Sequence, residues 1–403
     1  MTMESGVFGL IGRTLGHSYS QLIHKELGNP DYRLIELAPE ELAGFLANSS
    51  IGGLNVTIPY KRDVMQYCGS LSERAQEIGS VNTIIRTPTG LFGDNTDAYG
   101  LEYMAARAGI GFLDKKAVIF GSGGASLTAK FVAKRLGAKE VVAVSRSGED
   151  NYHNLSRHFD AQILINATPV GMFPKTGTAV ADVSAFPRCE GALDMVYNPR
   201  RTAFLMQAQS LGIPRSDGLP MLVAQAKAAE ELFFGKKIPD SENERILGLI
   251  RAETENIILI GMPGSGKTTV GAALAKLTCR ELIDIDAKIE EAANMPIPEI
   301  FEKLGEGEFR KMEREQTALC GALSGKIITT GGGVVKDERN YPSLHQNGRI
   351  YHILRDTKQL SRAGRPLSLF ADLEAMYKER LPHYERFRDA AAANSGAPEE
   401  TAQ

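Results

Sequence analysis

The sequence predicts an α/β fold with more than one parallel sheet, and two glycine-rich turns carry this prediction. The turn Gly121–Ser126 follows the apolar run Lys116–Phe120 and leads into a helix-forming run. The turn Gly261–Thr268 follows another apolar, β-branched run and also leads into a helix-forming run. In such turns, backbone N–H groups and a helix N-terminus bind phosphate. We therefore expect a Rossmann-type dinucleotide-binding domain and, after it, a P-loop domain with a parallel sheet.

Length and composition are those of ordinary globular proteins. The 403 residues allow two to three domains at about 150 residues each. Hydrophobic residues make up 43%, and the formal charge of −3 predicts neither a nucleic-acid nor a membrane partner. No apolar run has the length of a membrane span, and the N-terminus lacks the regions of a secretory signal. Four cysteines are expected as buried thiols of a reducing cytoplasm: Cys68, Cys189, Cys279 and Cys320.

Polar clusters follow apolar runs in the N-terminal part of the chain. The run Val7–Ile11 predicts a strand, and the loop after it carries Ser18 and Ser20. The run Gly53–Ile58 predicts a strand that a proline ends, with Lys61 just beyond. Polar loops at strand ends are where α/β proteins bind ligands. Taken alone, one serine is more simply a helix cap and Lys61 a solvated lysine.

Two further polar clusters complete a pattern. Asn82 lies between apolar runs, and Asp97 ends the polar run Asp94–Asp97, where it could also cap a helix. In order and spacing, the four clusters resemble those of the shikimate dehydrogenases over residues 6–235. One departure is Gln21, where this family usually has proline. We expect it to make the loop slightly less rigid.

The resemblance implies an α/β substrate domain and the reduction of 3-dehydroshikimate to shikimate. This chemistry needs a hydride on carbon and a proton on oxygen. The resemblance implies that Lys61 supplies the proton or stabilises the forming alkoxide, and that Asp97 pairs with Lys61 and grips a substrate hydroxyl. The substrate contacts that it implies are Ser18, Ser20, Thr57, Lys61, Asn82, Asp97, Tyr197 and Gln225.

The second strand of the Rossmann-type unit indicates which dinucleotide binds. The strand Glu140–Val144 is followed by Ser145 and Arg146, where an NAD site usually carries Asp or Glu. A guanidinium suits the 2′-phosphate instead, so we expect NADP. Two further buried strands are expected at Ile163–Met172 and Asp194–Pro199. The expected and implied NADP contacts are Gly121, Ser122, Gly123, Gly124, Ala125, Ser145, Arg146, Met195 and Gly218.

A connector is expected between the two halves. Ser241 and Glu244 predict a capping box for a short helix, with Ile246, Leu249 and Ile250 on one apolar face. This helix is expected to dock on its neighbours rather than act as a free tether. The predicted parts are a substrate domain at residues 1–97 completed by a helix at 219–235, an NADP domain at 98–218, the connector at 236–253 and a P-loop domain at 254–403.

The P-loop domain carries its own set of polar residues. Lys267 is expected to reach the β- and γ-phosphates of a nucleotide, and Thr268 to ligate Mg²⁺. The next strand is expected at Glu281–Asp286, ending in two acids that face alike. Over residues 254–394 the chain resembles the shikimate kinases. The residues that carry this resemblance are Arg310 with Glu313, Gly331–Gly333, Arg362, Gly364–Leu367 and Arg380 with Tyr384.

This second resemblance implies phosphoryl transfer from ATP to the 3-hydroxyl of shikimate. It implies that Asp284 holds the Mg²⁺ shell and that Asp286 orients the attacking hydroxyl. Arg310 and Arg380 would grip the substrate carboxylate, close to the backbone of Gly332. The implied ATP contacts are Gly264, Ser265, Gly266, Lys267, Thr268, Thr269 and Arg365, of which Lys267 and the lid residue Arg365 also act on the transferred phosphate.

One departure concerns the end of the chain. The shikimate kinases have a last strand and helix that help to hold adenine, whereas Asp389–Gln403 is alanine-rich and predicts a turn. Two hypotheses follow. The chain is a fused enzyme for two steps toward chorismate and the aromatic amino acids, or it is a dehydrogenase for shikimate or quinate with a non-catalytic, nucleotide-binding module. The oligomeric state is not predicted.

Overall fold

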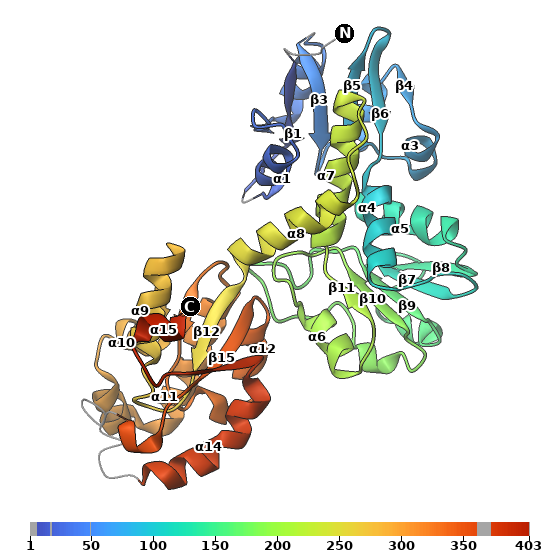
Figure 1. The fold of residues 1–403 in the computed structure, drawn as a ribbon. Helices are drawn as coiled ribbons and strands as arrows, with labels where there is room; N and C mark the ends of the chain where they lie inside the picture. The colour runs from blue at the N-terminus through green and yellow to red at the C-terminus, as the bar shows by residue number, and fades with distance from the viewer. Residues whose placement is uncertain (1–5, 17, 49, 361–371, 403) are drawn as a thin grey trace. The chain divides into compact units, whose positions relative to one another are not determined.

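The computed structural model describes residues 6–16, 18–48, 50–360 and 372–402 (Figure 1). The chain divides into two compact units: the second begins at Ile250 and also includes the short segment Phe173–Gly177, and the first holds the rest. The first unit holds a six-stranded mixed sheet and a five-stranded parallel sheet, and the second holds another five-stranded parallel sheet. An α/β fold with parallel sheets is thereby confirmed, while the four predicted domain boundaries stay predictions.

The mixed sheet of the first unit gathers the ends of several strands at one edge. Its order is β2-β1-β3-β5-β6-β4, with β5 antiparallel to both neighbours. Because β5 runs the other way, its first residue Thr83 pairs with Asn55 on β3 and with Asp94 on β6. The elements are β1 Val7–Gly12, α1 Ser20–Glu26, β2 Arg33–Glu36, α2 Leu42–Leu46, β3 Ile51–Val56, β4 Ser70–Leu71, α3 Glu73–Ile78, β5 Thr83–Thr87 and β6 Gly90–Asp94.

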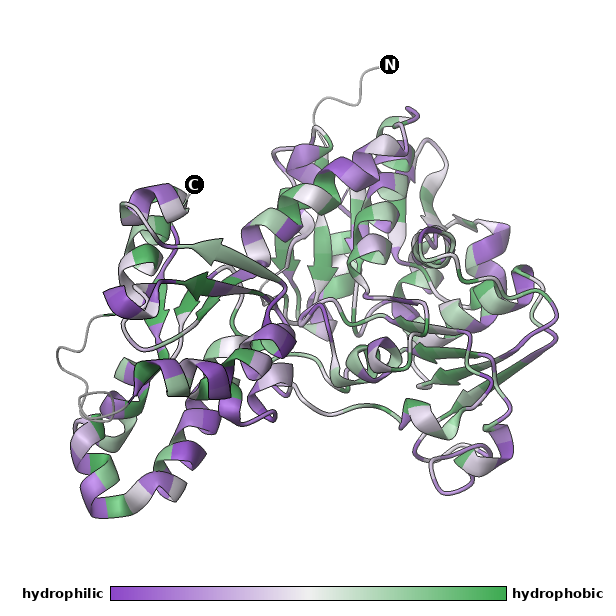
Figure 2. Cartoon of the chain, turned by 60° about the horizontal axis from the view of Figure 1, so that its bottom comes forward, coloured by the Kyte–Doolittle hydropathy of each residue, from purple (hydrophilic) through white to green (hydrophobic). Residues whose placement is uncertain are grey.

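The second sheet of this unit is parallel, in the order β11-β10-β9-β7-β8. Its central strands β7 and β9 are buried on both faces, as parallel strands covered by helices are, and Figure 2 shows them as hydrophobic. The elements are α4 Asp97–Arg107, β7 Lys116–Phe120, α5 Gly124–Arg135, β8 Glu140–Val144, β9 Ile163–Asn166, β10 Gly191–Asp194, α6 Ala203–Ser210, β11 Arg215–Ser216 and α7 Leu219–Phe234.

The strands expected at Ile163–Met172 and Asp194–Pro199 are shorter than predicted, and the second lies earlier in the chain. Asp194 is the last residue of β10 because its buried carboxylate binds groups that follow it. It accepts hydrogen bonds from the Val196 N–H at 3.0 Å and from Thr202 Oγ1 at 2.6 Å. These bonds turn the chain away from the sheet, which a count of apolar residues does not reveal.

The connector helix α8 spans Ser241–Thr254, and the capping box expected from Ser241 and Glu244 stays a prediction. The Glu244 carboxylate binds helix α4. It accepts a hydrogen bond from Tyr103 at 2.6 Å and forms an ion pair with Arg107 at 2.7 Å. Leu249 is 38% exposed, and Leu247 takes its place on the buried face.

The parallel sheet of the second unit has the order β13-β14-β12-β15-β16. The P-loop follows its central strand, so the nucleotide-binding turn lies at the carboxyl edge of the sheet. The elements are β12 Asn256–Ile260, α9 Lys267–Thr278, β13 Leu282–Asp284, α10 Ile285–Ala293, α11 Ile297–Ala322, β14 Ile327–Thr329, α12 Asn340–His345, β15 Gly348–Leu354, α14 Leu373–Phe387, β16 Ala390–Ala393 and α15 Pro398–Ala402.

The alanine-rich end of the chain corrects the expectation that the last strand is missing. Ala390–Ala393 forms β16, which pairs in parallel with β15, and α15 packs against α9. Alanine has a low strand propensity, yet the strand needs only backbone hydrogen bonds to its neighbour. Tertiary pairing therefore overrides the local signal.

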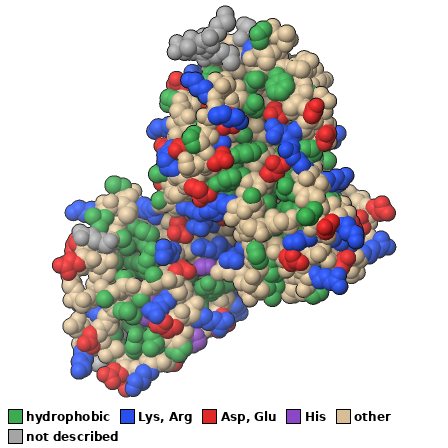
Figure 3. All heavy atoms as spheres, turned by 45° about the vertical axis from the view of Figure 1, so that its right-hand side comes forward, with side chains coloured by type: hydrophobic (Ala, Val, Ile, Leu, Met, Phe, Trp, Pro, Cys, Tyr) green, Lys and Arg blue, Asp and Glu red, His purple; other side chains and the backbone are tan. Residues whose placement is uncertain are grey.

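Two surface properties complete the description. No helix among the described residues is long and apolar enough to cross a membrane. On the face drawn in Figure 3, acidic and basic side chains lie among neutral and apolar ones. The expectation of four buried thiols is wrong: only Cys320 among them is buried, Cys68 and Cys189 are half-buried, and Cys279, directly after α9, is exposed.

Candidate active sites

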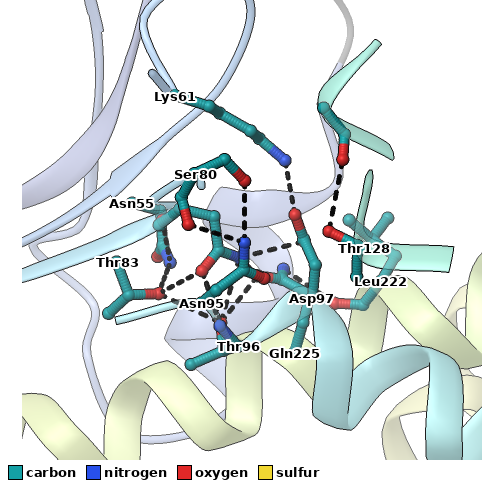
Figure 4. A network of polar contacts seen from close by, with 12 residues as sticks. Asn55, Lys61, Ser80, Thr83, Asn95, Thr96, Asp97, Thr128, Leu222 and Gln225 are labelled. Carbon is teal, nitrogen blue, oxygen red and sulfur yellow. Dashed lines mark hydrogen bonds and ion pairs between the residues drawn. The ribbon is translucent and has the colours of Figure 1, made fainter. Parts of the chain in front are cut away.

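Lys61 and Asp97 form an ion pair in the first unit (Figure 4). Lys61 follows β3, and Asp97 is the first residue of α4. Lys61 Nζ donates to Asp97 Oδ2 at 2.5 Å, and the two side chains are 19% and 11% exposed. The pair is therefore partly shielded from water but still open to a ligand.

Asn82 and Gln225 adjoin this pair. The Asn82 amide donates to Asp97 Oδ1 at 2.9 Å and to Gln225 Oε1 at 3.3 Å. Gln225 lies on α7, about 130 residues after α4 in sequence, so tertiary folding brings these groups together. Of the predicted substrate contacts, the structure joins Lys61, Asn82, Asp97 and Gln225 in one hydrogen-bonded cluster.

The remaining predicted substrate contacts lie in neighbouring loops. Ser18 Oγ donates to Ser20 Oγ at 2.9 Å, so the two hydroxyls lie together as predicted. The rings of Tyr19 and Tyr197 lie 5.6 Å apart, which brings Tyr197 to the same loop. The Thr57 N–H donates to the Ile11 carbonyl at 2.9 Å, which joins the loop after β3 to the end of strand β1.

The glycine-rich turn before α5 offers open space for a phosphate group. Gly121 has φ of +127°, and a Cβ there would lie 2.9 Å from the Ala167 carbonyl oxygen. A Cβ at Gly123 would meet nothing within 4 Å, whereas one at Gly124 would lie 3.8 Å from Lys61 Cδ. The turn with Ser122 and Ala125 therefore borders both open space and the catalytic candidate Lys61.

Other predicted NADP contacts lie along the same sheet edge. Ser145 and the exposed Arg146 follow β8. Burial raises the pKa of the Tyr152 hydroxyl, and the positive charge of Arg146 opposes this rise, so the two side chains are neighbours. A Cβ at Gly218 would lie 2.2 Å from the Met195 carbonyl oxygen, so the start of α7 packs directly on the chain after β10.

The P-loop of the second unit has the backbone of a phosphate-binding turn. Gly264 and Gly266 have φ of +84° and +92°, which favours glycine. Lys267 is buried, and its ammonium donates to two carbonyl groups of the loop, including that of Gly261 at 2.9 Å. The buried Ser265 hydroxyl has no hydrogen-bond partner in the part of the chain that the structure describes. Thr269 follows in the first turn of α9.

Asp284 joins the P-loop helix to the neighbouring strands. Its Oδ2 accepts from Thr268 Oγ1 at 3.1 Å and from Thr329 Oγ1 at 2.8 Å. Its Oδ1 accepts from the Asp286 N–H at 3.0 Å and caps α10. The expectation of a strand running to Asp286 is wrong, because this cap begins a helix directly after Asp284.

Asp286 is placed very differently from Asp284. Its Oδ1 is buried without a hydrogen-bond partner among the described residues, and a Cβ on Gly331 would lie 2.6 Å from that atom. Burial, together with the charge of Asp284, raises the pKa of the Asp286 carboxyl to about 6. A carboxylate of this kind accepts a proton near neutral pH and so fits a general base.

The glycine triplet after β14 lies between two arginines. Arg380 Nη1 donates to the Gly332 carbonyl at 3.0 Å, and Tyr384 donates to the same oxygen at 2.7 Å. A Cβ on Gly333 would lie 2.8 Å from Arg310 Nη1, which forms an ion pair with Glu313 at 2.8 Å. The structure therefore gathers the predicted carboxylate-binding groups around one loop. Arg362 and Arg365 lie outside the described residues.

Three site residues were missed by sequence reasoning. Thr329 binds Asp284, Thr96 accepts from the Asn82 amide at 3.0 Å, and Asn394 donates to the Ser265 carbonyl at 2.7 Å. Thr329 and Thr96 lie in polar segments next to strand ends, and such a position in the sequence already indicates a possible site residue. Asn394 follows an alanine run, and its partner lies 129 positions earlier.

Comparisons with known proteins agree with both halves. The family model described as shikimate dehydrogenase substrate binding domain matches residues 10–84, and that of shikimate kinase matches residues 263–403. A shikimate dehydrogenase (NADP(+)) of Clostridium perfringens is 36% identical over 261 residues, covering 60% of this chain and 96% of that protein. The enzyme of the same description from Synechocystis is 32% identical, covering 59% and 93%.

Solved structures are similar over the same part of the chain. A chorismate mutase/shikimate 5-dehydrogenase fusion protein from Clostridium acetobutylicum has a TM-score of 0.59 at 35% identity, covering 61% of this chain and 97% of that chain. Shikimate 5-dehydrogenase from Thermus thermophilus, in complex with NADP(H) and shikimate, has a TM-score of 0.55 at 29% identity, covering 60% and 99%.

Proposed function

The chain belongs to the shikimate dehydrogenase family over its N-terminal part and carries a shikimate kinase-like domain after it, and from this premise we propose a bifunctional enzyme. The first unit reduces 3-dehydroshikimate to shikimate with NADPH. The second unit transfers a phosphoryl group from ATP to shikimate and forms shikimate 3-phosphate, a step toward chorismate.

The observation that carries the first activity is the Lys61–Asp97 pair beside the glycine-rich turn. The ammonium lies 2.5 Å from Asp97, and the turn that would bind the cofactor phosphates borders Lys61. A ketone reductase needs a proton donor next to its hydride donor. The relatives that cover this part of the chain are NADP-dependent shikimate dehydrogenases, which supports the same activity.

In this mechanism Asp97 holds the Lys61 ammonium toward the ketone oxygen. When bound, NADPH supplies the hydride to the ketone carbon. As negative charge develops on the oxygen, Lys61 stabilises it and transfers a proton. Asp97 and Asn82 stay hydrogen-bonded to each other, so the pair keeps its geometry through the step. Other polar groups bind the carboxylate and hydroxyls of the substrate: Ser18, Ser20, Thr57, Tyr197 and Gln225.

The residues of the parallel sheet fit NADP. Gly123 leaves room for the pyrophosphate at the N-terminus of α5, and Gly121 lets the turn pass close to the Ala167 carbonyl. Arg146 is exposed just after β8, where a 2′-phosphate would lie. Met195 and Gly218 would adjoin the nicotinamide.

The observation that carries the second activity is Asp286, buried beside the glycine triplet and the P-loop. Asp286 takes the proton of the attacking hydroxyl, while Arg310 and Arg380 bind the carboxylate of shikimate. Lys267 leaves the loop carbonyls and donates to the transferred phosphoryl group. Arg365 would close over the phosphates.

The hydroxyl and carboxylate donors near the P-loop fit Mg²⁺. Thr268 and Asp284 lie 3.1 Å apart, and oxygen ligands of this kind bind Mg²⁺ together with substrate phosphates. When bound, Mg²⁺ neutralises charge on the phosphate oxygens. Thr329 keeps Asp284 oriented toward this position.

Separate assays of one purified chain test the proposal. NADPH oxidation is followed with 3-dehydroshikimate, and ATP consumption is followed with shikimate. Lys61→Ala should lower the first rate by about 10²- to 10⁴-fold and leave the second intact. Asp286→Asn should do the reverse. If a variant that still folds loses both activities, the two-site proposal is wrong, and quinate oxidation with NAD would indicate a different substrate.

A further inference from the structure

We propose that Thr83, which is buried and is not among the expected substrate contacts, is a positioning residue for ketone reduction; this inference rests on the proposed dehydrogenase function. Thr83 begins β5 and is 1% exposed. Its hydroxyl lies in a buried hydrogen-bond network that ends on Asp97 (Figure 4).

The orientation of the Asn82 amide is determined by a backbone group. The Thr96 N–H donates to Asn82 Oδ1 at 2.6 Å, and a backbone N–H can only donate. The atom that faces Asp97 at 2.9 Å is therefore the amide nitrogen. Asp97 thus accepts at one oxygen from Asn82 and at the other from Lys61. Both carboxylate oxygens of Asp97 therefore have a donor, and the side chain has a fixed orientation toward Lys61.

The Thr83 hydroxyl is one of three donors that face the Asn82 oxygen, together with the Thr96 N–H and, at 3.2 Å, the Thr96 hydroxyl. It lies 3.0 Å from Asn82 Oδ1 and 3.0 Å from Thr96 Oγ1, and its single proton can point to either atom. Asn55 Nδ2 donates to the Thr83 oxygen at 3.2 Å from the other side. With that lone pair occupied, the Thr83 proton is directed toward Asn82 and its partner Thr96.

The amide of Asn55 is oriented in turn. Its nitrogen faces both Thr83 Oγ1 and, at 3.4 Å, the Asn82 carbonyl oxygen. A rotated amide would bring two oxygen atoms together, so the observed orientation is favoured. Asn55 Oδ1 accepts from the Tyr32 hydroxyl at 2.7 Å.

The Tyr32 hydroxyl is the hydrogen-bond donor at the start of this network. Burial, and secondarily the charge of Glu230, raises the pKa of the Tyr32 hydroxyl well above its usual value, so the hydroxyl keeps its proton. Its ring stacks on His24 at 3.6 Å, and His24 binds the buried Glu230. Helices α1 and α7 thereby anchor the network from behind.

The bonds from Tyr32 through Asn55 and Thr83 to Asn82 consequently run in one direction and end on Asp97. Hydrogen bonds aligned in this way strengthen one another. Loss of the Thr83 hydroxyl removes one of the donors that hold the Asn82 oxygen away from Asp97. The amide then turns more readily, and Lys61 loses its fixed partner. The expected consequence is a lower kcat rather than weaker NADPH binding.

A pair of substitutions separates positioning from packing. Thr83→Val keeps the shape of the side chain and removes the hydroxyl, whereas Thr83→Ser keeps the hydroxyl and removes a methyl group. Positioning predicts that Thr83→Val lowers kcat for ketone reduction by about tenfold and that Thr83→Ser retains most of it. The KM for NADPH should stay within about twofold in both. Packing alone predicts the opposite order, because the valine variant keeps the volume.

A second pair tests the distal part of the network. Tyr32→Phe removes the hydroxyl but keeps the ring on His24, and it should lower kcat by a smaller factor than Thr83→Val. Tyr60→Phe is the matched control, because Tyr60 is equally buried and its hydroxyl donates at 2.5 Å to the Leu37 carbonyl, outside the network. Thermal unfolding of all four variants verifies that they fold.

The possible outcomes distinguish the positioning role of Thr83 from the proposed dehydrogenase function. If Thr83→Val is as active as the unaltered chain, or if Tyr60→Phe lowers kcat as much as Tyr32→Phe, the positioning role is refuted. If the unaltered chain reduces no 3-dehydroshikimate, the proposed function fails first, and this inference fails with it. A kcat order of Ser above Val, with Tyr32→Phe below Tyr60→Phe, supports the role.

Discussion

At the scale of single residues, two carboxyl groups two positions apart have different chemistry. Asp284 accepts hydrogen bonds from two threonine hydroxyls and caps a helix. Asp286 has a buried oxygen without a hydrogen-bond partner among the described residues, and burial raises the pKa of its carboxyl to about 6. Environments that separate two acids in this way are typical of sites that need one metal ligand and one base.

We predict that Asp286→Asn raises the stability of the second unit at pH 7 while abolishing phosphoryl transfer. The pKa of Asp286 rises from 3.8 to about 6 on folding, mainly through burial. The folded state therefore binds this proton more tightly than the unfolded state, and stability falls as the pH rises from about 4 to 6. Neutral asparagine removes this loss, which is on the order of 1–3 kcal/mol.

Thermal unfolding at pH 4 and at pH 7 measures the effect. At pH 7 the variant should unfold at a higher temperature than the unaltered chain. At pH 4 the two unfolding temperatures should be equal. Glu281→Gln is the control, because Glu281 is exposed and Lys326 lowers its pKa, so its removal cannot stabilise the unit at pH 7. Equal unfolding temperatures at both pH values would contradict the prediction.

A second residue-scale prediction concerns the choice of cofactor. Arg146→Ala should lower kcat/KM for NADPH by the equivalent of about 1.5–3 kcal/mol, because a charge-assisted contact to the 2′-phosphate is lost. The kcat/KM for NADH should stay unchanged. Arg157→Ala, an exposed arginine of the same domain, is the matched control. Equal losses for NADPH and NADH would mean that Arg146 supports the fold instead.

At the scale of elements, close backbone contacts determine where site residues lie. Helix α7 carries Gln225 to the substrate cluster, and its first turn begins against the chain that follows β10. In the second unit, β16 carries Asn394 to the carbonyl of Ser265 in the P-loop. Both contacts join segments that are far apart in sequence, so a small displacement of one element moves a functional group.

We predict that Gly218→Ala impairs ketone reduction and costs about 1–3 kcal/mol of unfolding free energy. The new Cβ would lie 2.2 Å from the Met195 carbonyl oxygen, so α7 must shift and displace Gln225. Gly111→Ala is the control, because a Cβ there meets nothing within 4 Å. Chemical denaturation and steady-state rates of both variants provide the test, and equal behaviour would contradict it.

At the scale of the whole molecule, the two candidate sites draw on separate residues. The dehydrogenase cluster lies before the unit boundary, and the P-loop, Asp286 and the two arginines lie after it. Each set includes its own candidates for binding the substrate carboxylate, Ser18 and Ser20 in one and Arg310 and Arg380 in the other. Reduction is reversible and transfer from ATP is strongly downhill, so the second reaction would draw the first forward.

We predict that this coupling operates through shikimate in solution. A small polyol diffuses away much faster than a turnover of about 1–10³ s⁻¹. The chain is given 3-dehydroshikimate, NADPH and ATP in a medium that contains labelled shikimate. The label should enter shikimate 3-phosphate in proportion to its share of the shikimate present. Product without label would demonstrate direct transfer and overturn the prediction.

The sequence alone determined the features that depend on neighbours along the chain. Gly121, Gly264 and Gly266 adopt positive φ angles that few other residues tolerate, and short apolar runs place these turns between strand and helix. The order of the polar clusters was likewise readable, because spacing is a property of the sequence. These features were sufficient for both family resemblances and for the fold class.

Only the tertiary structure decided burial and the choice of distant partners. Asp286 and Asp284 look alike in sequence, and only burial beside Gly331 raises the pKa of Asp286 to about 6. The strand β16 exists because β15 supplies its hydrogen bonds, which alanines by themselves do not predict. Thr83 acquires its partner Asn55 because β3 and β5 pair in antiparallel register. Desolvation and hydrogen bonding depend on which segments meet in space, and sequence proximity does not contain that information.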